Sequence, residues 1–89
     1  MKTAPHLTFR QKVLAYVMTI PKGSVATYGY VAKQAGKPKA ARAVGAILKT
    51  NFDPQIPCHR VIRSDGSLGE YNRGAKAKRA RLQKEGAIK

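Results

Sequence analysis

The chain has 89 residues, of which 43% are hydrophobic, and 18 Lys and Arg stand against 4 Asp and Glu, a formal charge of +14. This length predicts one domain over residues 1–89 with a small core. No apolar run is long enough to span a membrane, and residues 1–7, expected to be flexible, lack a signal-peptide pattern, so we expect a cytoplasmic protein. One cysteine and two histidines exclude an intramolecular disulfide and a structural zinc site.

The positive charge is concentrated in the first half of the sequence. The first acidic residue is Asp53, and residues 1–52 carry nine Lys or Arg. Such a field attracts a polyanion, and nucleic acid is the usual one. The alternatives are a solubilising surface or a ribosome-associated basic protein. The charge favours a nucleic-acid partner over a membrane surface.

The spacing of apolar residues predicts four helices, over residues 8–20, 28–35, 39–50 and 74–86. Thr8 and Thr27 are suitable N-caps for the first and second of them. Gly36 ends the second helix, and Pro38 suits the start of the third. The short segment 24–27 is predicted to be extended or to form a tight turn.

The third predicted helix has an apolar face and an opposite face that is cationic and otherwise made of small side chains. This outer face contains Lys39, Arg42, Ala46 and Lys49. Two short helices joined by a tight turn, over residues 28–50, indicate either an ordinary helical hairpin or a DNA-binding helix-turn-helix. The wholly positive outer face favours the second interpretation.

Residues 51–63 are predicted to be a loop, followed by a wing and a last helix over residues 64–87. A turn signal at residues 64–67 separates two short apolar pieces and predicts a β-hairpin. In the last helix we expect Ala75 and Leu82 to face inward and the basic side chains to face outward, at Lys76, Lys78, Arg79 and Arg81. The predicted fold class is mainly α, a winged helix-turn-helix with a short β-hairpin wing.

Cys58 is the candidate for chemistry. It follows Pro57 and precedes His59 and Arg60. Nearby cations lower the pKa of a thiol and increase the fraction of nucleophilic thiolate, and His59 could accept the proton. The alternative is that Cys58 is a small buried apolar residue without a chemical role.

Residues 57–62, with the sequence PCHRVI, resemble the active-site signature of the O6-alkylguanine-DNA alkyltransferases. Further segments resemble this family in the same order, at 21–28 (PKGSVATY), 38–45 (PKAARAVG), 69–74 (GEYNRG) and 82–86 (LQKEG). The resemblance covers residues 8–87 and corresponds to the C-terminal, DNA-binding and active-site domain of the family.

The resemblance implies a stoichiometric transfer of an alkyl group from guanine O6 to Cys58, without metal or cofactor. His59, oriented by Glu85, would withdraw the thiol proton through a water. Asn51 would brace the turn between the third helix and the active-site loop. Tyr28 would donate a hydrogen bond to guanine N3 and offset the charge that develops on the leaving base.

The resemblance also implies how a monomer of this chain would bind DNA. The third helix would enter the minor groove, Arg42 would replace the flipped base in the stack, and Lys39 and Lys49 would contact phosphates. The implied set of DNA-binding residues is Tyr28, Lys39, Ala40, Ala41, Arg42, Gly45 and Lys49.

The implied substrate pocket is formed by Leu48, Val61, Tyr71 and Asn72. The main-chain carbonyls of Cys58 and Val61 would accept hydrogen bonds from the guanine amine. The main-chain N–H of Asn72 would donate to O6, and Tyr71 would form a wall.

Two other functions are compatible with the sequence. Alkyltransferase-like proteins resemble this chain in length and bind alkylated DNA without repairing it, but they typically replace the cysteine with tryptophan or alanine. A basic winged-helix transcription regulator is the other. The presence of Cys58 favours transfer.

Overall fold

The computed structural model describes residues 7–51, 53, 55–69 and 74–88. Its elements, in chain order, are α1 (Phe9–Val17), β1 (Ala26–Thr27), α2 (Tyr28–Gln34), α3 (Ala41–Lys49), the 3-10 turn η1 (Cys58–Arg60), β2 (Val61–Ile62) and α4 (Ala75–Glu85). All four predicted helices are confirmed, with ends shifted by a few residues. None of the helices in the described ranges is long and apolar enough to cross a membrane.

The first two helices begin at the predicted threonines because these side chains cap exposed backbone amides. Thr8 Oγ1 accepts from Gln11 N at 3.1 Å, and the Gln11 side chain accepts from Thr8 N at 2.8 Å, which completes a capping box. Thr27 Oγ1 accepts from Tyr30 N at 3.0 Å. This second cap fixes the position at which α2 starts, and therefore the position of Tyr28.

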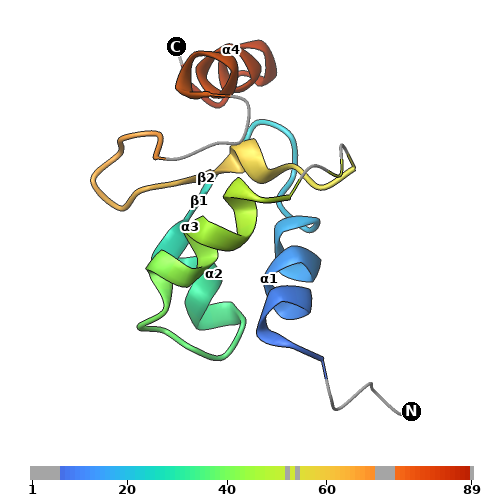
Figure 1. Ribbon diagram of the computed structural model, residues 1–89. Helices are drawn as coiled ribbons and strands as arrows, with labels where there is room; N and C mark the ends of the chain where they lie inside the picture. Colours follow the sequence, from blue (N-terminus) through green and yellow to red (C-terminus); the bar gives the residue numbers. More distant parts are fainter. Residues whose placement is uncertain (1–6, 52, 54, 70–73, 89) are drawn as a thin grey trace.

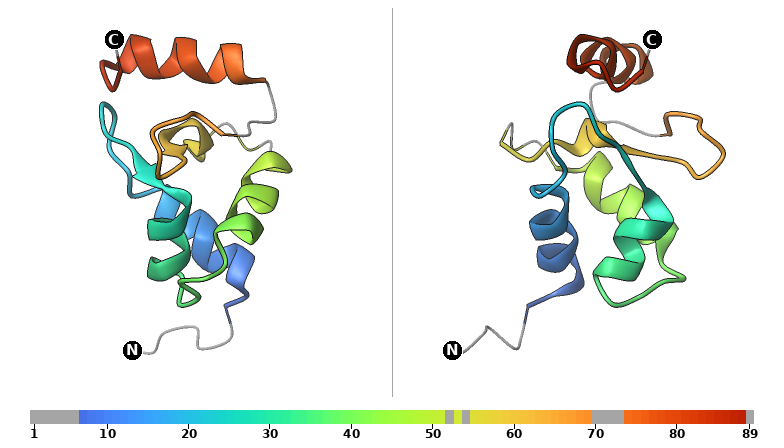
Figure 2. Two further views of the ribbon diagram at one scale, coloured as in Figure 1. Left: turned by 90° about the vertical axis from the view of Figure 1, so that its left-hand side faces the viewer. Right: turned by 180° about the vertical axis from the view of Figure 1, so that it is seen from behind.

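Helices α1, α2 and α3 pack together at one end of the molecule (Figure 1). Helix α4 lies across the opposite end, with η1 between it and the other helices (Figure 2). The core between these elements is apolar and includes Val13, Val17, Tyr28, Val31, Val44, Leu48, Cys58 and Val61. Its buried members come from α1, α2, α3, η1 and β2 and from the ends of these helices, and Cys58 is one of them.

The expected β-hairpin between residues 61 and 68 is wrong, although the turn between them is formed. Strand β2 pairs in parallel with β1, with Ala26 opposite Val61 and Thr27 opposite Ile62, and in the described ranges no strand follows β2. The reason lies in the turn after β2, which closes when Arg63 N donates to the Ser67 carbonyl at 2.9 Å. The next carbonyl, that of Leu68, accepts from the Lys78 ammonium and not from a strand.

Helix α4 differs from its predicted orientation at two positions. Ala75 is exposed, whereas Lys78 is fully buried with 0% of its surface accessible. The helical pattern placed Lys78 outside because lysine is usually solvated. Its ammonium group is satisfied inside the molecule, so only Leu82 of the expected inward residues is buried.

Replacing Thr27 with alanine should lower the free energy of unfolding by about 1 kcal/mol, because the Tyr30 amide loses its cap. Thr27→Ser keeps the hydroxyl and should retain most of this stability. Urea unfolding followed by circular dichroism measures both changes. Equal losses in the two variants would show that the methyl group of Thr27, and not its hydroxyl, carries the stabilisation.

Candidate active site

Cys58 begins η1 and is nearly buried, with 6% of its surface accessible. Its sulfur accepts a hydrogen bond from Asn51 Nδ2 at 2.9 Å. Asn51 lies just after α3 and is itself buried, and its Oδ1 accepts from the Asp53 amide at 3.4 Å. Asn51 therefore links the end of α3 to the sulfur and to the loop that follows.

The pKa of the Cys58 thiol is raised, which contradicts the expectation of a lowered value. Burial is the main cause, and the Asn51 hydrogen bond and the positive charge of Lys78 act in the opposite direction. The expected lowering requires His59 and Arg60 to act as cations beside the thiol. In the structure both side chains contact Glu85, and burial favours the neutral form of His59, so they do not offset the desolvation of the thiol.

Glu85, at the end of α4, binds both residues that follow Cys58. Its Oε2 lies 2.8 Å from His59 Nε2 and accepts from Arg60 Nη2 at 2.8 Å, and its Oε1 accepts from Arg60 Nε at 2.9 Å. Arg60 Nη1 also donates to the Ile20 carbonyl at 2.8 Å. This forked contact ties α4 and the loop before β1 to η1.

These contacts set the charge states of the cluster. Hydrogen bonds from Arg60 and then from His59 lower the pKa of Glu85 to about 2, so the carboxylate is ionised at neutral pH. Burial lowers the pKa of His59, and Glu85 only partly offsets this effect. A neutral His59 that donates from Nε2 to Glu85 carries an unprotonated Nδ1, which is able to accept a proton.

The expected neighbours His59 and Glu85 are thus in contact, and Arg60 is an additional member of this cluster. From the sequence, Arg60 is only a cation near Cys58. Nothing local indicates that it shares a carboxylate with His59, because Glu85 is 25 residues away in the chain.

Tyr28 is the first residue of α2 and is buried, and Lys78 of α4 contacts it. Lys78 Nζ donates to Tyr28 Oη at 3.1 Å and to the Leu68 carbonyl, and it lies 5.3 Å from the centre of the Tyr28 ring. Burial lowers the pKa of Lys78 to about 8. A Cβ on Gly69 would lie 2.7 Å from the Tyr28 ring, so the chain passes the tyrosine at a point where only glycine fits without a shift.

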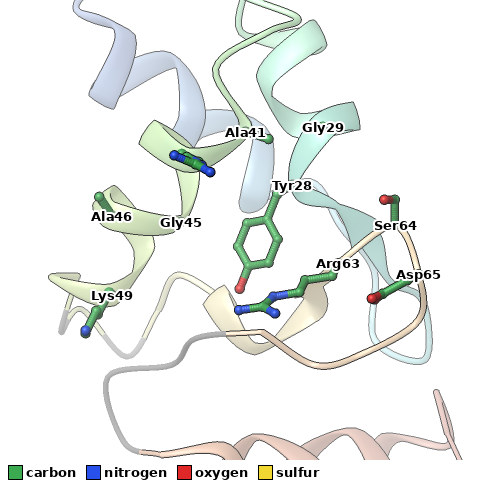
Figure 3. Close-up of a pocket in the computed structure, with 10 residues that line it drawn as sticks. Tyr28, Gly29, Ala41, Gly45, Ala46, Lys49, Arg63, Ser64 and Asp65 are labelled. Atoms are coloured by element: carbon green, nitrogen blue, oxygen red, sulfur yellow. The ribbon is translucent and has the colours of Figure 1, made fainter.

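A cavity of about 740 Å³ lies between α2, α3 and the turn after β2 (Figure 3). Of the predicted DNA-binding residues, five line it: Tyr28, Ala41, Arg42, Gly45 and Lys49. The other lining residues are Gly29, Ala46, Arg63, Ser64 and Asp65. The small side chains of α3 leave its backbone close to the open space.

Several predicted site residues lie elsewhere. Leu48 and Val61 are buried in the core and do not line this cavity, and neither does Cys58. The cavity meets Tyr28, which contacts Lys78, and the charge of Lys78 acts on Cys58. Lys39 is exposed and Ala40 is partly buried just before α3. Tyr71 and Asn72 lie outside the described residues.

The cluster around Cys58 has no metal-binding arrangement in the described residues, which hold no group of three His, Cys, Asp or Glu able to bind an ion. The donors that are present satisfy one another: His59 and Arg60 hold Glu85, and Asn51 holds Cys58. The site therefore offers a thiol, a neutral imidazole and an ionised carboxylate.

The structure thus combines a helix pair and a basic cavity, as in a DNA-binding domain, with a buried thiol beside an imidazole–carboxylate pair. The family model described as 6-O-methylguanine DNA methyltransferase, DNA binding domain, matches residues 8–87. The chain belongs to this family.

Individual relatives agree with this assignment. The methylated-DNA–protein-cysteine methyltransferase of Methanothermobacter thermautotrophicus is 47% identical over 79 residues, which are 88% of this chain and 44% of that protein. Mycobacterium tuberculosis OGT in complex with DNA has a TM-score of 0.83 and 44% identity, over 89% of this chain and 49% of that one. The chain therefore spans about half the length of these relatives.

A shorter relative is also similar. S. pombe Atl1, in complex with damaged DNA containing O6-carboxymethylguanine, has a TM-score of 0.79 and 36% identity. The match covers 97% of this chain and 80% of Atl1. Both relatives of known structure are described with DNA bound.

The buried Lys78 predicts a pH dependence of stability. The unfolded chain keeps a proton on this lysine up to pH 10.5, and the folded chain only up to about pH 8. Between these values the unfolded state binds more protons, so stability should increase with pH, by up to about 1.4 kcal/mol per pH unit. Lys78→Met should lack this increase in urea unfolding at pH 7–9.5. Parallel pH curves for the two proteins would contradict the lowered pKa.

The lowered pKa of Glu85 predicts a pH dependence of the same sign in acid. Its contribution to stability is complete above the usual pKa of 4.5 and is lost as the pH falls toward about 2. Glu85→Gln should be less stable at pH 7 by roughly 1–3 kcal/mol, with a difference from wild type that shrinks between pH 4.5 and 2. A difference that stays constant over this range, measured by thermal unfolding, would show that Glu85 acts through packing alone.

Proposed function

We propose that this protein transfers an alkyl group from O6 of guanine in double-stranded DNA to its own Cys58. The observation that carries the proposal is the arrangement around this sulfur: Asn51 donates to it, and the next residue, His59, is paired with Glu85. A thiol beside an imidazole–carboxylate pair is a recognised form of activated nucleophile.

The raised pKa of Cys58 means that the thiol keeps its proton until a base removes it. His59 Nδ1 accepts that proton through a water, and Glu85 stabilises the resulting imidazolium. The sulfur then attacks the alkyl carbon, a carbon–sulfur bond forms and the bond from carbon to O6 breaks. Since no second thiol exists in the chain, each molecule reacts once.

Tyr28 is the acid for the leaving guanine. Its Oη accepts from Lys78 Nζ, so the hydroxyl proton is directed away from the ammonium group. In our proposal it donates to guanine N3, and the positive charge of Lys78 stabilises the tyrosine as its proton shifts. The main-chain groups of Cys58, Val61 and Asn72, with the side chains of Leu48 and Tyr71, surround the base.

The lesion must leave the helix to reach this site. We propose that α3 enters the minor groove, where the small residues Ala41 and Gly45 permit close approach, and that Arg42 takes the place of the flipped base. Lys39 and Lys49 contact phosphates, and the protein acts as a monomer. The turn at residues 63–67 serves as the wing of this helix-turn-helix. Because the cavity meets Tyr28 and not Cys58, the base passes Tyr28 before it meets the sulfur.

A second function is supported by the match to S. pombe Atl1, most of whose length this chain covers. In that alternative the protein binds alkylated DNA and does not repair it. Cys58, with its hydrogen bond from Asn51, supports transfer over binding alone.

Incubation with a duplex that contains O6-methylguanine should add one methyl group to the protein, as measured by intact mass. The added group should map to Cys58 and should be absent after incubation with undamaged duplex or in Cys58→Ser. Tight binding of the lesion with unchanged mass would instead identify a lesion sensor. Equal affinity for damaged and undamaged duplex would indicate a general DNA-binding regulator.

A further inference from the structure

Arg63 is placed by the parallel strand pair beside Tyr28. Thr27 at the end of β1 is paired with Ile62 at the end of β2, so Tyr28 and Arg63 are the next residues of two strands in register. Both line the cavity (Figure 3), where the Arg63 guanidinium lies near the hydroxyl end of the Tyr28 ring. The sheet therefore brings a cation to the residue that meets the base.

The backbone of Arg63 is held from both sides. β2 precedes it, and the turn that follows is closed by the bond from Arg63 N to the Ser67 carbonyl at 2.9 Å and from Gly66 N to the Arg63 carbonyl at 3.0 Å. Gly66 has φ +90°, a conformation that other residues rarely adopt. The guanidinium thus lines the cavity from a backbone that hydrogen bonds hold in place, and the Arg63 side chain is exposed.

Positive charge surrounds this cavity on two sides. Arg42 and Lys49 line it from α3, and Arg63 lines it from the turn. Asp65 is the one acidic lining residue, and its Oδ1 accepts from Ser67 N at 2.9 Å and Ser67 Oγ at 2.7 Å. In the described part of the chain, no carboxylate lies within ion-pair distance of Arg63 or Arg42, and the nearby Asp65 interacts with the charge of Arg63 only at longer range. Cations that converge on an open cavity favour an anionic ligand.

We propose that Arg63 binds the backbone phosphate of the nucleotide that turns toward Tyr28. The inference rests on the proposed function, since it takes the extrahelical nucleotide as the occupant of the cavity. The fork of a guanidinium matches two phosphate oxygens. The base contacts Tyr28, and the phosphate beside it is held between Arg63 and the cations of α3. Arg63 thereby recognises the extrahelical nucleotide and contributes less to binding of an intact duplex.

The test measures binding in a Cys58→Ser background, so that the complex does not turn over. With a duplex bearing O6-methylguanine, Arg63→Gln should weaken binding by at least about 10-fold, as expected for the loss of a charged hydrogen bond. It should also reduce the slope of log affinity against log salt by about 1. Binding of undamaged duplex should change less. Arg63→Lys keeps the charge but not the forked geometry, so its affinity for the lesion duplex should lie between those of the Arg63 protein and of Arg63→Gln.

Two controls make the result specific. Arg79→Gln removes an exposed arginine from α4, outside the cavity, and should have a small effect on both duplexes. With Cys58 restored, Arg63→Gln should slow the reaction with the duplex substrate more than the reaction with the free base O6-benzylguanine, because the free base has no phosphate. The proposal is overturned if Arg63→Gln weakens lesion binding no more than Arg79→Gln, or if it slows the free base as much as the duplex.

This outcome is separate from the outcome for the proposed function. If the wild-type protein binds the lesion but gains no methyl group, the transfer reaction is wrong, while the binding comparison still decides whether Arg63 contacts the phosphate. If the protein is methylated and Arg63→Gln binds like Arg79→Gln, the reaction stands and the role of Arg63 is wrong.

Discussion

The contact of Glu85 with His59 and Arg60 determines the arrangement of the site. Of the described α4 residues only Lys78 and Leu82 are buried, so this helix has little apolar area with which to bind the rest of the molecule. The forked contact with η1 supplies a specific attachment, with a carboxylate whose pKa is held near 2. Because one carboxylate accepts hydrogen bonds from both His59 and Arg60, the position of α4 and the orientation of His59 are fixed by the same interaction.

This arrangement separates the Cys58 thiol from the side chains of the two residues that follow it in the sequence. His59 and Arg60 adjoin Cys58 in the chain, yet both side chains contact Glu85, and the pKa of the thiol is raised. The sulfur is accordingly protonated at rest. In the proposed reaction a base must therefore remove the proton once the substrate is bound, and His59, whose pKa is lowered by burial, would be that base.

The helices could be predicted from the sequence because their caps and apolar spacing are local signals, as at Thr8 and Thr27. The partnership of His59 with Glu85 could be predicted only through the family resemblance, since nothing local relates two residues so far apart. Lys78 could not be predicted at all. Its burial depends on two acceptors, Tyr28 Oη and the Leu68 carbonyl, that come from separate parts of the chain. The parallel pairing of β2 with β1 could not be predicted for a similar reason, because its two strands lie far apart in the chain and the turn at residues 63–67 indicates a local hairpin instead.

The parallel pair of short strands has a mechanical consequence. Tyr28 and Arg63 emerge from adjacent, hydrogen-bonded strands and are tied further by Lys78, which joins Tyr28 to the carbonyl of Leu68 just past the turn. These contacts couple the position of the turn to the position of the tyrosine. In the proposed complex, a displacement of the turn by bound DNA would also move the Tyr28 ring, so that the contact with the DNA backbone and the alignment of the flipped base would change together.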